Sequence, residues 1–121
     1  MFGILYNPEN AKINYPKYSY QITDSVSIET ENEPGFFNHS CEPNIFINSN
    51  WMFEAFEDIE ENSEITIDYG CADCYDYEFI CECKKISCRK IFKGDICKNE
   101  DFQKTHGTTF TPYFKNKFNI K

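Results

Sequence analysis

The chain has 121 residues, which suits one domain, and 40% of them are apolar, so it should fold. Its formal net charge of −8 argues against direct binding of nucleic acid, which needs clustered Lys and Arg. The sequence lacks an apolar run of about 18 residues that could span a membrane, and residues 1–10 lack the features of a signal peptide. We therefore expect an intracellular protein that binds neither nucleic acid nor a membrane, and we expect a monomer.

Short alternating segments predict a mostly β fold of small sheets. The predicted strands are residues 18–22, 45–47, 51–56 and 64–69. The predicted loops and turns between them are residues 29–35, 48–50 and 60–63. The last part of the chain, residues 101–121, carries five aromatic residues, and we expect a short helix and coil that pack on the body.

A polar cluster stands between two apolar segments at residues 36–44, which read Phe-Phe-Asn-His-Ser-Cys-Glu-Pro-Asn. Asn, His, Ser and Cys offer hydrogen bonds, a thiolate and a tight turn, but almost no core material. These residue types favour a functional segment over a simple surface loop.

Seven cysteines predict a metal site, because a chain without a secretion signal more often uses thiolates for zinc than for disulfides. Cys81, Cys83 and Cys88 give three ligands, and a structural zinc site usually has four. Cys41 can supply the fourth. In the alternative set, Cys71 and Cys74, spaced as in a zinc ribbon, join Cys81 and Cys83. In the first assignment Cys71, Cys74 and Cys97 remain as free thiols or a partial second site.

These motifs together resemble the SET-domain protein lysine methyltransferases. Residues 36–44 are similar to that family's Asn-His-Ser-Cys-x-Pro-Asn segment, and residues 64–69 to its Glu-Leu-Thr-x-Asp-Tyr strand. Residues 81–88 resemble its post-SET zinc motif, and residues 18–24 resemble the strand that precedes the Asn-His segment. The resemblance covers roughly residues 16–94.

The resemblance implies a SET-domain β-clip of small sheets, with pseudoknot-like threading and a zinc-bound post-SET segment. It divides the chain into a SET-like part at residues 1–70, a post-SET zinc lid at residues 71–97 and a tail at residues 98–121. The family places the fourth zinc ligand at the cysteine of the Asn-His-Ser-Cys segment, which is Cys41 here. We expect residues 71–97 to be irregular and to need the metal for order.

The resemblance also implies methyl transfer from S-adenosylmethionine to the side-chain amine of a protein lysine. The family's motifs map the main catalytic tyrosine to Tyr69, and Tyr18 is our candidate for a second one. Asn38 and His39, together with Phe37, match the cofactor-binding segment, and we do not expect His39 to act as a general base. A lysine amine has a pKa of about 10.4, so the site must favour its neutral form.

A basic protein, such as a histone tail, is the expected substrate, and the nucleus is the expected compartment in a eukaryote. The basis is two groups of acidic residues that would attract such a protein. One lies in residues 54–64 (Glu54, Glu57, Asp58, Glu60, Glu61 and Glu64) and the other in the lid (Asp73, Asp76, Glu78 and Glu82). Two departures from the family keep other functions open. The family's Gly-x-Gly strand has no match in residues 1–20, as if about one hairpin were absent, and Gly35 stands where an Arg is usual. The alternatives are a non-catalytic SET-like peptide-binding module and a simple zinc-stabilised interaction domain.

Overall fold

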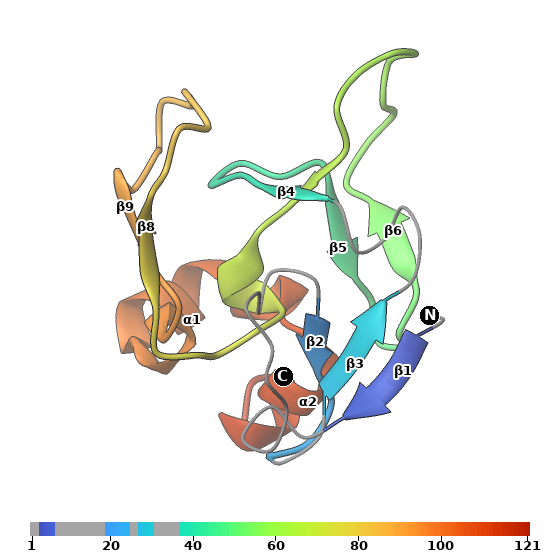
Figure 1. The fold of residues 1–121 in the computed structure, drawn as a ribbon, viewed down its shortest axis with the longest axis vertical. Helices are drawn as coiled ribbons and strands as arrows, with labels where there is room; N and C mark the ends of the chain where they lie inside the picture. The colour runs from blue at the N-terminus through green and yellow to red at the C-terminus, as the bar shows by residue number, and fades with distance from the viewer. Residues whose placement is uncertain (1–2, 7–18, 25–26, 31–36) are drawn as a thin grey trace.

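A computed structural model describes residues 3–6, 19–24, 27–30 and 37–121. In this part of the chain the protein is built mostly of small β-sheets, with short helices gathered toward the C-terminus (Figure 1). The predicted mostly β fold is therefore confirmed. Among the described residues, no helix has the length and apolar character needed to cross a membrane.

The first sheet contains the strands β1 (Gly3–Tyr6), β2 (Ser19–Gln21) and β3 (Ser27–Thr30) in the order β1-β3-β2, and both pairs are antiparallel. The strand predicted at residues 18–22 is confirmed for Ser19–Gln21, whereas Tyr18 lies outside the described residues. The loop predicted to begin at Glu29 is wrong at its start, because Glu29 still pairs with Ile4 on one side and Ser19 on the other.

The two segments that carry the family motifs lie side by side. Strand β4 (Asn38–His39) pairs in parallel with β7 (Thr66–Ile67). The Asn44 side chain fixes this arrangement, because its oxygen accepts a hydrogen bond from the Thr66 N–H at 2.8 Å and its amide donates to the Glu64 carbonyl at 2.8 Å.

Strands β5 (Ile45–Ile47) and β6 (Phe53–Ala55) form the predicted hairpin. The predicted turn after β5 is confirmed, and the Asn48 side chain caps it by accepting backbone N–H bonds from Asn50 and Met52. Trp51 still belongs to this turn, since its φ is 57°, so the returning strand is shorter than predicted.

The strand predicted at residues 64–69 is also too long. It ends after Ile67, because the Asp68 side chain accepts the Gly70 N–H at 2.9 Å and caps the short 3-10 helix η3 (Tyr69–Cys71). Tyr69 therefore starts a helical turn instead of ending a strand.

The segment predicted to be irregular, residues 71–97, contains an antiparallel hairpin of β8 (Glu78–Ile80) and β9 (Ile91–Lys93), followed by the 3-10 helix η4 (Ile96–Lys98). That part of the prediction is wrong. Phe79 and Phe92 face each other across the hairpin and stack with ring centroids 4.8 Å apart. This pair gives the hairpin an apolar face. The sequence pattern did not indicate this face, because most residues around the pair are polar.

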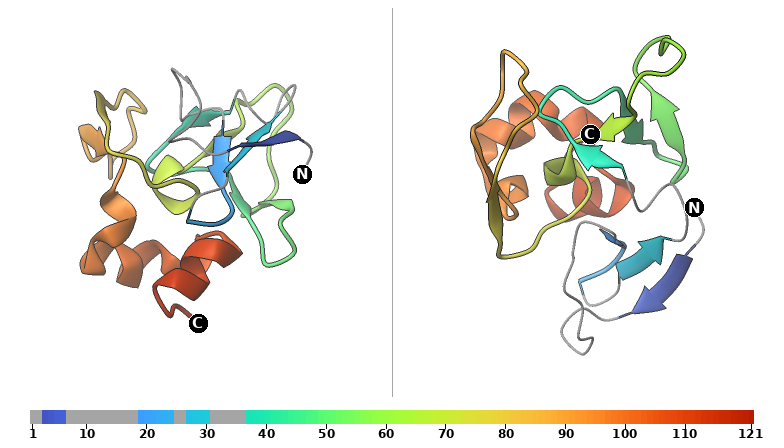
Figure 2. Two further views of the ribbon diagram at one scale, coloured as in Figure 1. Left: turned by 60° about the horizontal axis from the view of Figure 1, so that its bottom comes forward. Right: turned by 45° about the horizontal axis from the view of Figure 1, so that its top comes forward.

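The tail forms two short helices instead of one, α1 (Glu100–His106) and α2 (Pro112–Lys117), with the 3-10 helix η5 (Gly107–Thr109) between them. Asn99 caps α1 by accepting the Phe102 N–H at 2.9 Å, and Thr111 caps α2 just before Pro112. Figure 2 shows both helices gathered on one side of the small sheets.

In the part of the chain that the structure describes, the core consists of two apolar clusters. One lies among the strands (Tyr20, Ile45, Ile47, Ile67, Tyr69, Ala72 and Phe92). The other lies under the tail helices (Cys71, Cys97, Phe102, Phe110 and Phe114), and Ile96 packs against both. Gly70 allows this close contact, because a Cβ there would lie 2.7 Å from an Ile96 methyl carbon and 3.0 Å from the Phe102 ring.

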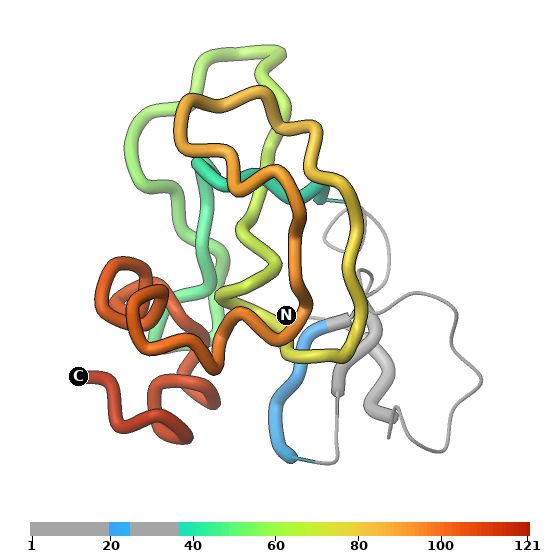
Figure 3. The backbone as a smooth tube through the Cα atoms, turned by 90° about the vertical axis from the view of Figure 1, so that its left-hand side faces the viewer, coloured from blue at the N-terminus to red at the C-terminus, as the bar shows by residue number. Residues whose placement is uncertain are grey.

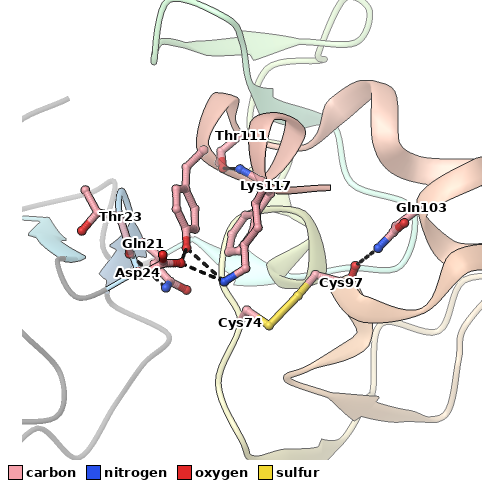
Figure 4. Close-up of a disulfide and its surroundings, with 10 residues drawn as sticks. Gln21, Thr23, Asp24, Cys74, Cys97, Gln103, Thr111 and Lys117 are labelled. Atoms are coloured by element: carbon pink, nitrogen blue, oxygen red, sulfur yellow. Dashed lines mark hydrogen bonds and ion pairs between the residues drawn. A yellow bond between two sulfur atoms is a disulfide. The ribbon is translucent and has the colours of Figure 1, made fainter. Parts of the chain in front are cut away.

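Cys74 and Cys97 form a disulfide, so the expectation that both are free thiols or part of a second metal site is wrong (Figure 4). The bond links the segment after η3 to η4, next to the core cluster under the tail helices. Sequence reasoning missed this pair, because 23 residues separate the two cysteines and only the fold brings them together. Cys71 is a buried free thiol.

Cys74→Ser is expected to lower the free energy of unfolding by about 3 kcal/mol, because the bond closes a long loop in the unfolded chain. Guanidinium denaturation of the zinc-saturated protein under oxidising conditions measures this difference. The same comparison with a phosphine reductant present is the control, and there the two proteins should become similar. Equal midpoints under oxidising conditions would show that the bond contributes nothing.

Candidate active site and metal centre

Four cysteine sulfurs from distant parts of the chain meet at one point. The Sγ atoms of Cys41, Cys81, Cys83 and Cys88 all lie within 4.8 Å of one another, and the Cys41 and Cys81 sulfurs are 3.8 Å apart. A tetrahedral zinc site with zinc–sulfur bonds of about 2.3 Å places its sulfurs about 3.8 Å apart. The geometry of these sulfurs therefore fits a four-cysteine zinc site.

Backbone N–H groups point at these sulfurs. Arg89 N–H donates to the Cys41 sulfur at 3.3 Å, and Lys90 N–H donates to the Cys88 sulfur at 3.4 Å. Burial raises the pKa of the Cys81 thiol to about 12, since a bare thiolate there would be desolvated. A divalent cation among the four sulfurs reverses this preference and favours the thiolates.

The cysteines come from two loops that face each other. Cys41 follows β4, and the other three lie in the connection between β8 and β9. Figure 3 shows the segment with this hairpin (yellow to orange) running beside the teal segment that holds β4. The Glu42 carboxylate tightens the contact, because it accepts hydrogen bonds from the Ser87 N–H at 3.1 Å and the Ser87 hydroxyl at 2.9 Å.

The structure does not bring the alternative ligand set together. Cys74 is in the disulfide, and Cys71 packs under the tail helices with its sulfur 3.8 Å from the Thr109 hydroxyl. Among the described residues, neither belongs to the group of sulfurs around Cys41. The zinc-ribbon arrangement is therefore not the one that this fold presents.

Arg89 connects the cysteine cluster to the strand that leads to Tyr69. Its guanidinium donates two hydrogen bonds to the buried Asp68 carboxylate, at 2.8 and 3.0 Å, and lies 4.9 Å from the Phe102 ring centroid. Such charge-assisted, bidentate hydrogen bonds are stronger than hydrogen bonds between neutral groups. Sequence analysis missed it, although Arg89 directly follows Cys88 and Asp68 precedes Tyr69.

His39 makes a second connection between the cluster and Tyr69. Its Nδ1 accepts the Tyr69 N–H at 3.1 Å, so its Nε2 carries the proton and faces the Cys41 sulfur at 3.6 Å. The pKa of His39 is lowered to about 4, mainly by burial; the Asp68 charge opposes this change and the Arg89 charge adds to it. His39 is thus neutral at physiological pH and holds two neighbours in place.

Tyr69 is held firmly and lies beside open space. The residue is 8% exposed, and its ring contacts the rings of His39, Phe79 and Phe92. Its hydroxyl donates a hydrogen bond to the Phe37 carbonyl at 2.7 Å. Tyr69 also lines a groove of about 1260 Å³, so it is not sealed inside the core.

The groove separates the β4–β7 region from the β8–β9 hairpin. Residues from the first side are Asn38, His39, Ser40, Glu57, Glu64 and Thr66, and residues from the second are Tyr77, Phe79, Ile80, Glu82 and Lys84. The wall thus combines aromatic rings, hydrogen-bonding side chains and carboxylates. Such a mixed, concave surface can bind a polar organic cofactor and an extended peptide.

The other predicted cofactor residues have different surroundings. Asn38 lines the groove, where its amide donates to the Glu64 carboxylate at 2.7 Å. The Phe37 ring instead packs edge-on against Phe53 with centroids 5.4 Å apart, and Phe37 is not part of the groove wall. Tyr18, the predicted second tyrosine, lies outside the described residues. Tyr77 and Phe79, which were not predicted from the sequence, line the groove together with Tyr69.

Comparison with known families identifies the family to which this chain is similar. The model of a family described as the SET domain matches residues 5–70, which is more than half of the chain. The matched range contains Asn38, His39, Cys41 and Tyr69, whereas the other three cysteines of the cluster lie beyond it. A search of curated proteins finds no match to the chain.

Proposed function

This chain belongs to the SET-domain family, and we propose that it transfers a methyl group from S-adenosylmethionine to a lysine amine on a protein. SET-domain proteins are in general protein-lysine methyltransferases. The observation that carries the proposal is the position of Tyr69, which the β4–β7 pair and η3 place at the wall of the groove with its hydroxyl fixed by Phe37.

The groove residues suit the cofactor. S-adenosylmethionine would supply its methyl group from a cationic sulfonium. The amide of Asn38 and the backbone beside it can hydrogen-bond the amino-acid end of such a molecule. The rings of Tyr69, Tyr77 and Phe79 offer aromatic surface to an adenine and to a positive charge. The groove volume of about 1260 Å³ leaves room for the substrate side chain as well.

The substrate lysine must reach the groove as a neutral amine with its lone pair directed at the methyl group. Tyr69 can do this, because its ring is immobilised by three aromatic neighbours and its oxygen can accept a hydrogen bond from the amine while its proton is held by Phe37. Desolvation between aromatic rings lowers the pKa of a lysine amine and so favours the reactive form.

The cysteine cluster would hold one structural zinc ion. The metal would join the loop after β4 to the β8–β9 hairpin and so keep both walls of the groove together. Cys41 touches Arg89 and His39, and these two residues contact Asp68 and Tyr69. A metal at this point therefore supports the position of the catalytic tyrosine.

A basic segment of another protein, such as a histone tail, is the proposed substrate. Among the described residues, the groove is lined by four glutamates (Glu42, Glu57, Glu64 and Glu82) and two lysines (Lys84 and Lys85). This surplus of negative charge attracts Lys- and Arg-rich chains and steers them inward.

A peptide-binding module without catalysis is the second candidate. It is favoured by the Asn38 amide, which is already paired with Glu64 at 2.7 Å instead of pointing freely into the groove. Such a protein would keep the zinc site and the acidic groove but would not bind the cofactor.

Calorimetric titration with S-adenosylmethionine, followed by incubation of the zinc-loaded protein with labelled cofactor and mixed histones, tests the proposal. We expect micromolar cofactor binding and label on a lysine of a basic protein. Absence of both signals, with histone peptides still bound, would identify the second candidate as correct. S-adenosylhomocysteine is the competitor control and should reduce both signals.

A further inference from the structure

The outer face of the β8–β9 hairpin carries apolar side chains that are exposed to water. Side chains alternate between the two faces of a strand, so Phe79 and Phe92 pack inward while the paired residues Ile80 and Ile91 lie on the opposite face. Ile80 is 77% exposed, Ile91 is 51% exposed, and Ile86 in the connection between the strands is fully exposed. Single apolar residues on a surface need no explanation, whereas several on one small hairpin indicate a contact surface.

The same hairpin is a basic region of an acidic chain. Residues 84–93 contain five Lys or Arg and no Asp or Glu, whereas residues 18–83 contain no Lys or Arg. Arg89 is paired with Asp68 inside the molecule. The other four are exposed and form no ion pair within the described part of the chain: Lys84, Lys85, Lys90 and Lys93. Glu78 and Glu82 on the β8 side reduce this positive surplus but do not remove it.

The connection between β6 and β7 has the opposite charge. Residues 54–64, here called the acidic loop, contain six exposed Asp or Glu and no Lys or Arg. None of these carboxylates takes part in an ion pair among the residues that the structure describes. Apolar groups accompany them, since Phe56 is 48% exposed and Met52, just before β6, is 60% exposed. The acidic loop therefore offers the negative and apolar groups that suit the hairpin. A nucleic acid would pair with the lysines but leave the isoleucines in water.

The hairpin and the acidic loop project from the same end of the molecule, on opposite sides of β4 (Figures 1 and 3). The groove lies between them, because Glu57 and Glu64 line it from the acidic loop, and Lys84 and Lys85 line it from the hairpin. Consider a second copy related by a twofold axis that lies beyond this end and between the two segments. The hairpin of each copy then meets the acidic loop of the other, and the contact closes at two copies.

We propose that this protein forms a twofold symmetric dimer in which the hairpin of each copy docks on the acidic loop of the other. The proposal replaces the expectation of a monomer. The net charge of −8 on each copy opposes association at long range. At a salt concentration of about 0.1 M the Debye length is only about 10 Å, so the unlike charges that come into contact outweigh the distant like charges.

Analytical ultracentrifugation of the zinc-loaded full chain at about 0.1 M salt measures the association. With rising protein concentration, we expect the mass to increase from the 14.3 kDa of one chain to twice that value and no further. Lys84→Glu combined with Lys85→Glu, the hairpin variant, should weaken the dimer at least about tenfold, because like charges then meet at both contacts. Salt at about 1 M, where the Debye length is about 3 Å, should weaken the parent dimer as well.

A second variant with the opposite charge change makes the test specific. Glu60→Lys combined with Glu61→Lys, the loop variant, should also dimerise poorly, although its smaller net negative charge would by itself favour association. Mixing the two variants puts unlike charges at both contacts again, so we expect a 1:1 heterodimer with nearly the parental affinity. Lys98→Glu combined with Lys104→Glu is the matched control. It changes the net charge as the hairpin variant does, but on exposed residues of η4 and α1 outside both surfaces, and should dimerise like the parent.

The results that contradict the proposal are distinct. A parent protein that stays monomeric up to a concentration on the order of 1 mM overturns it. So does a dimer that neither the hairpin variant nor the loop variant weakens, because it must use another surface. If the monomer instead binds vesicles of anionic lipid and the hairpin variant does not, the hairpin serves a membrane and the dimer is wrong. Equal zinc content and thermal midpoints check that the variants fold. The inference goes beyond methyl transfer, and an inactive protein can still confirm it.

Discussion

Cys41→Ser is expected to lower zinc affinity more than about 100-fold. Replacement of groups that only support a metal ligand already costs about 10- to 100-fold, and Cys41 supplies one of the four sulfurs that meet within 4.8 Å. Competition with a chromophoric chelator measures the affinity. Zinc loss should also release the β8–β9 hairpin from the loop after β4, which hydrogen exchange of the hairpin amides detects.

Two other variants make this result specific. Cys83→Ser removes another sulfur of the same cluster and should match Cys41→Ser in effect. Cys71→Ser changes a buried thiol that lies under the tail helices, outside the cluster, and should keep the zinc affinity of the parent. If Cys71→Ser loses zinc while Cys41→Ser retains it, the ribbon-like set with Cys71 and Cys74 is the true one.

Three of the four zinc ligands could be predicted from the sequence, because cysteines that bind one zinc ion often lie close together in the chain. Cys81, Cys83 and Cys88 lie within eight residues, so one local turn is enough to bring their three sulfurs to one point. The fourth sulfur could not be derived in this way, because Cys41 is 40 residues from Cys81. Its assignment depended on the family resemblance, and the structure places its sulfur with the other three.

Other contacts between residues far apart in the sequence could not be predicted either. Cys74 and Cys97 meet only because η3 and η4 pack together, and Arg89 reaches Asp68 only because the hairpin folds back over η3. Nothing in the local pattern of either partner indicates the other. Such pairs follow from the tertiary fold, which single-sequence patterns do not specify.

The strand predictions were wrong mainly at the ends of the strands. Residues 64–69 alternate in polarity like a strand, but the Asp68 side chain captures the Gly70 N–H and starts a helical turn. Local side-chain bonds of this kind compete with strand pairing. The consequence is functional, since the turn directs Tyr69 toward Phe37 and the groove.

Tyr69→Phe is expected to lower the rate of methyl transfer by at least about 100-fold, the effect of removing one well-placed hydrogen-bonding group from a reacting centre. The ring should stay in place, because His39, Phe79 and Phe92 still surround it. The lost hydroxyl leaves the Phe37 carbonyl without this donor, so the free energy of unfolding should fall by about 1 kcal/mol. Single-turnover kinetics with labelled cofactor and denaturant unfolding measure the two quantities.

The ratio between these two effects decides whether Tyr69 acts on the substrate. A hydroxyl that only supports the fold would lower activity in step with stability, and about 1 kcal/mol corresponds to less than tenfold. Cofactor affinity serves as the internal control, since the Asn38 side of the groove is untouched and the calorimetric signal should persist. A Tyr69→Phe protein that transfers methyl groups at the parental rate would place the reacting amine elsewhere in the groove. A strong loss of rate with intact cofactor binding requires the phenol oxygen itself, because the change removes no other atom.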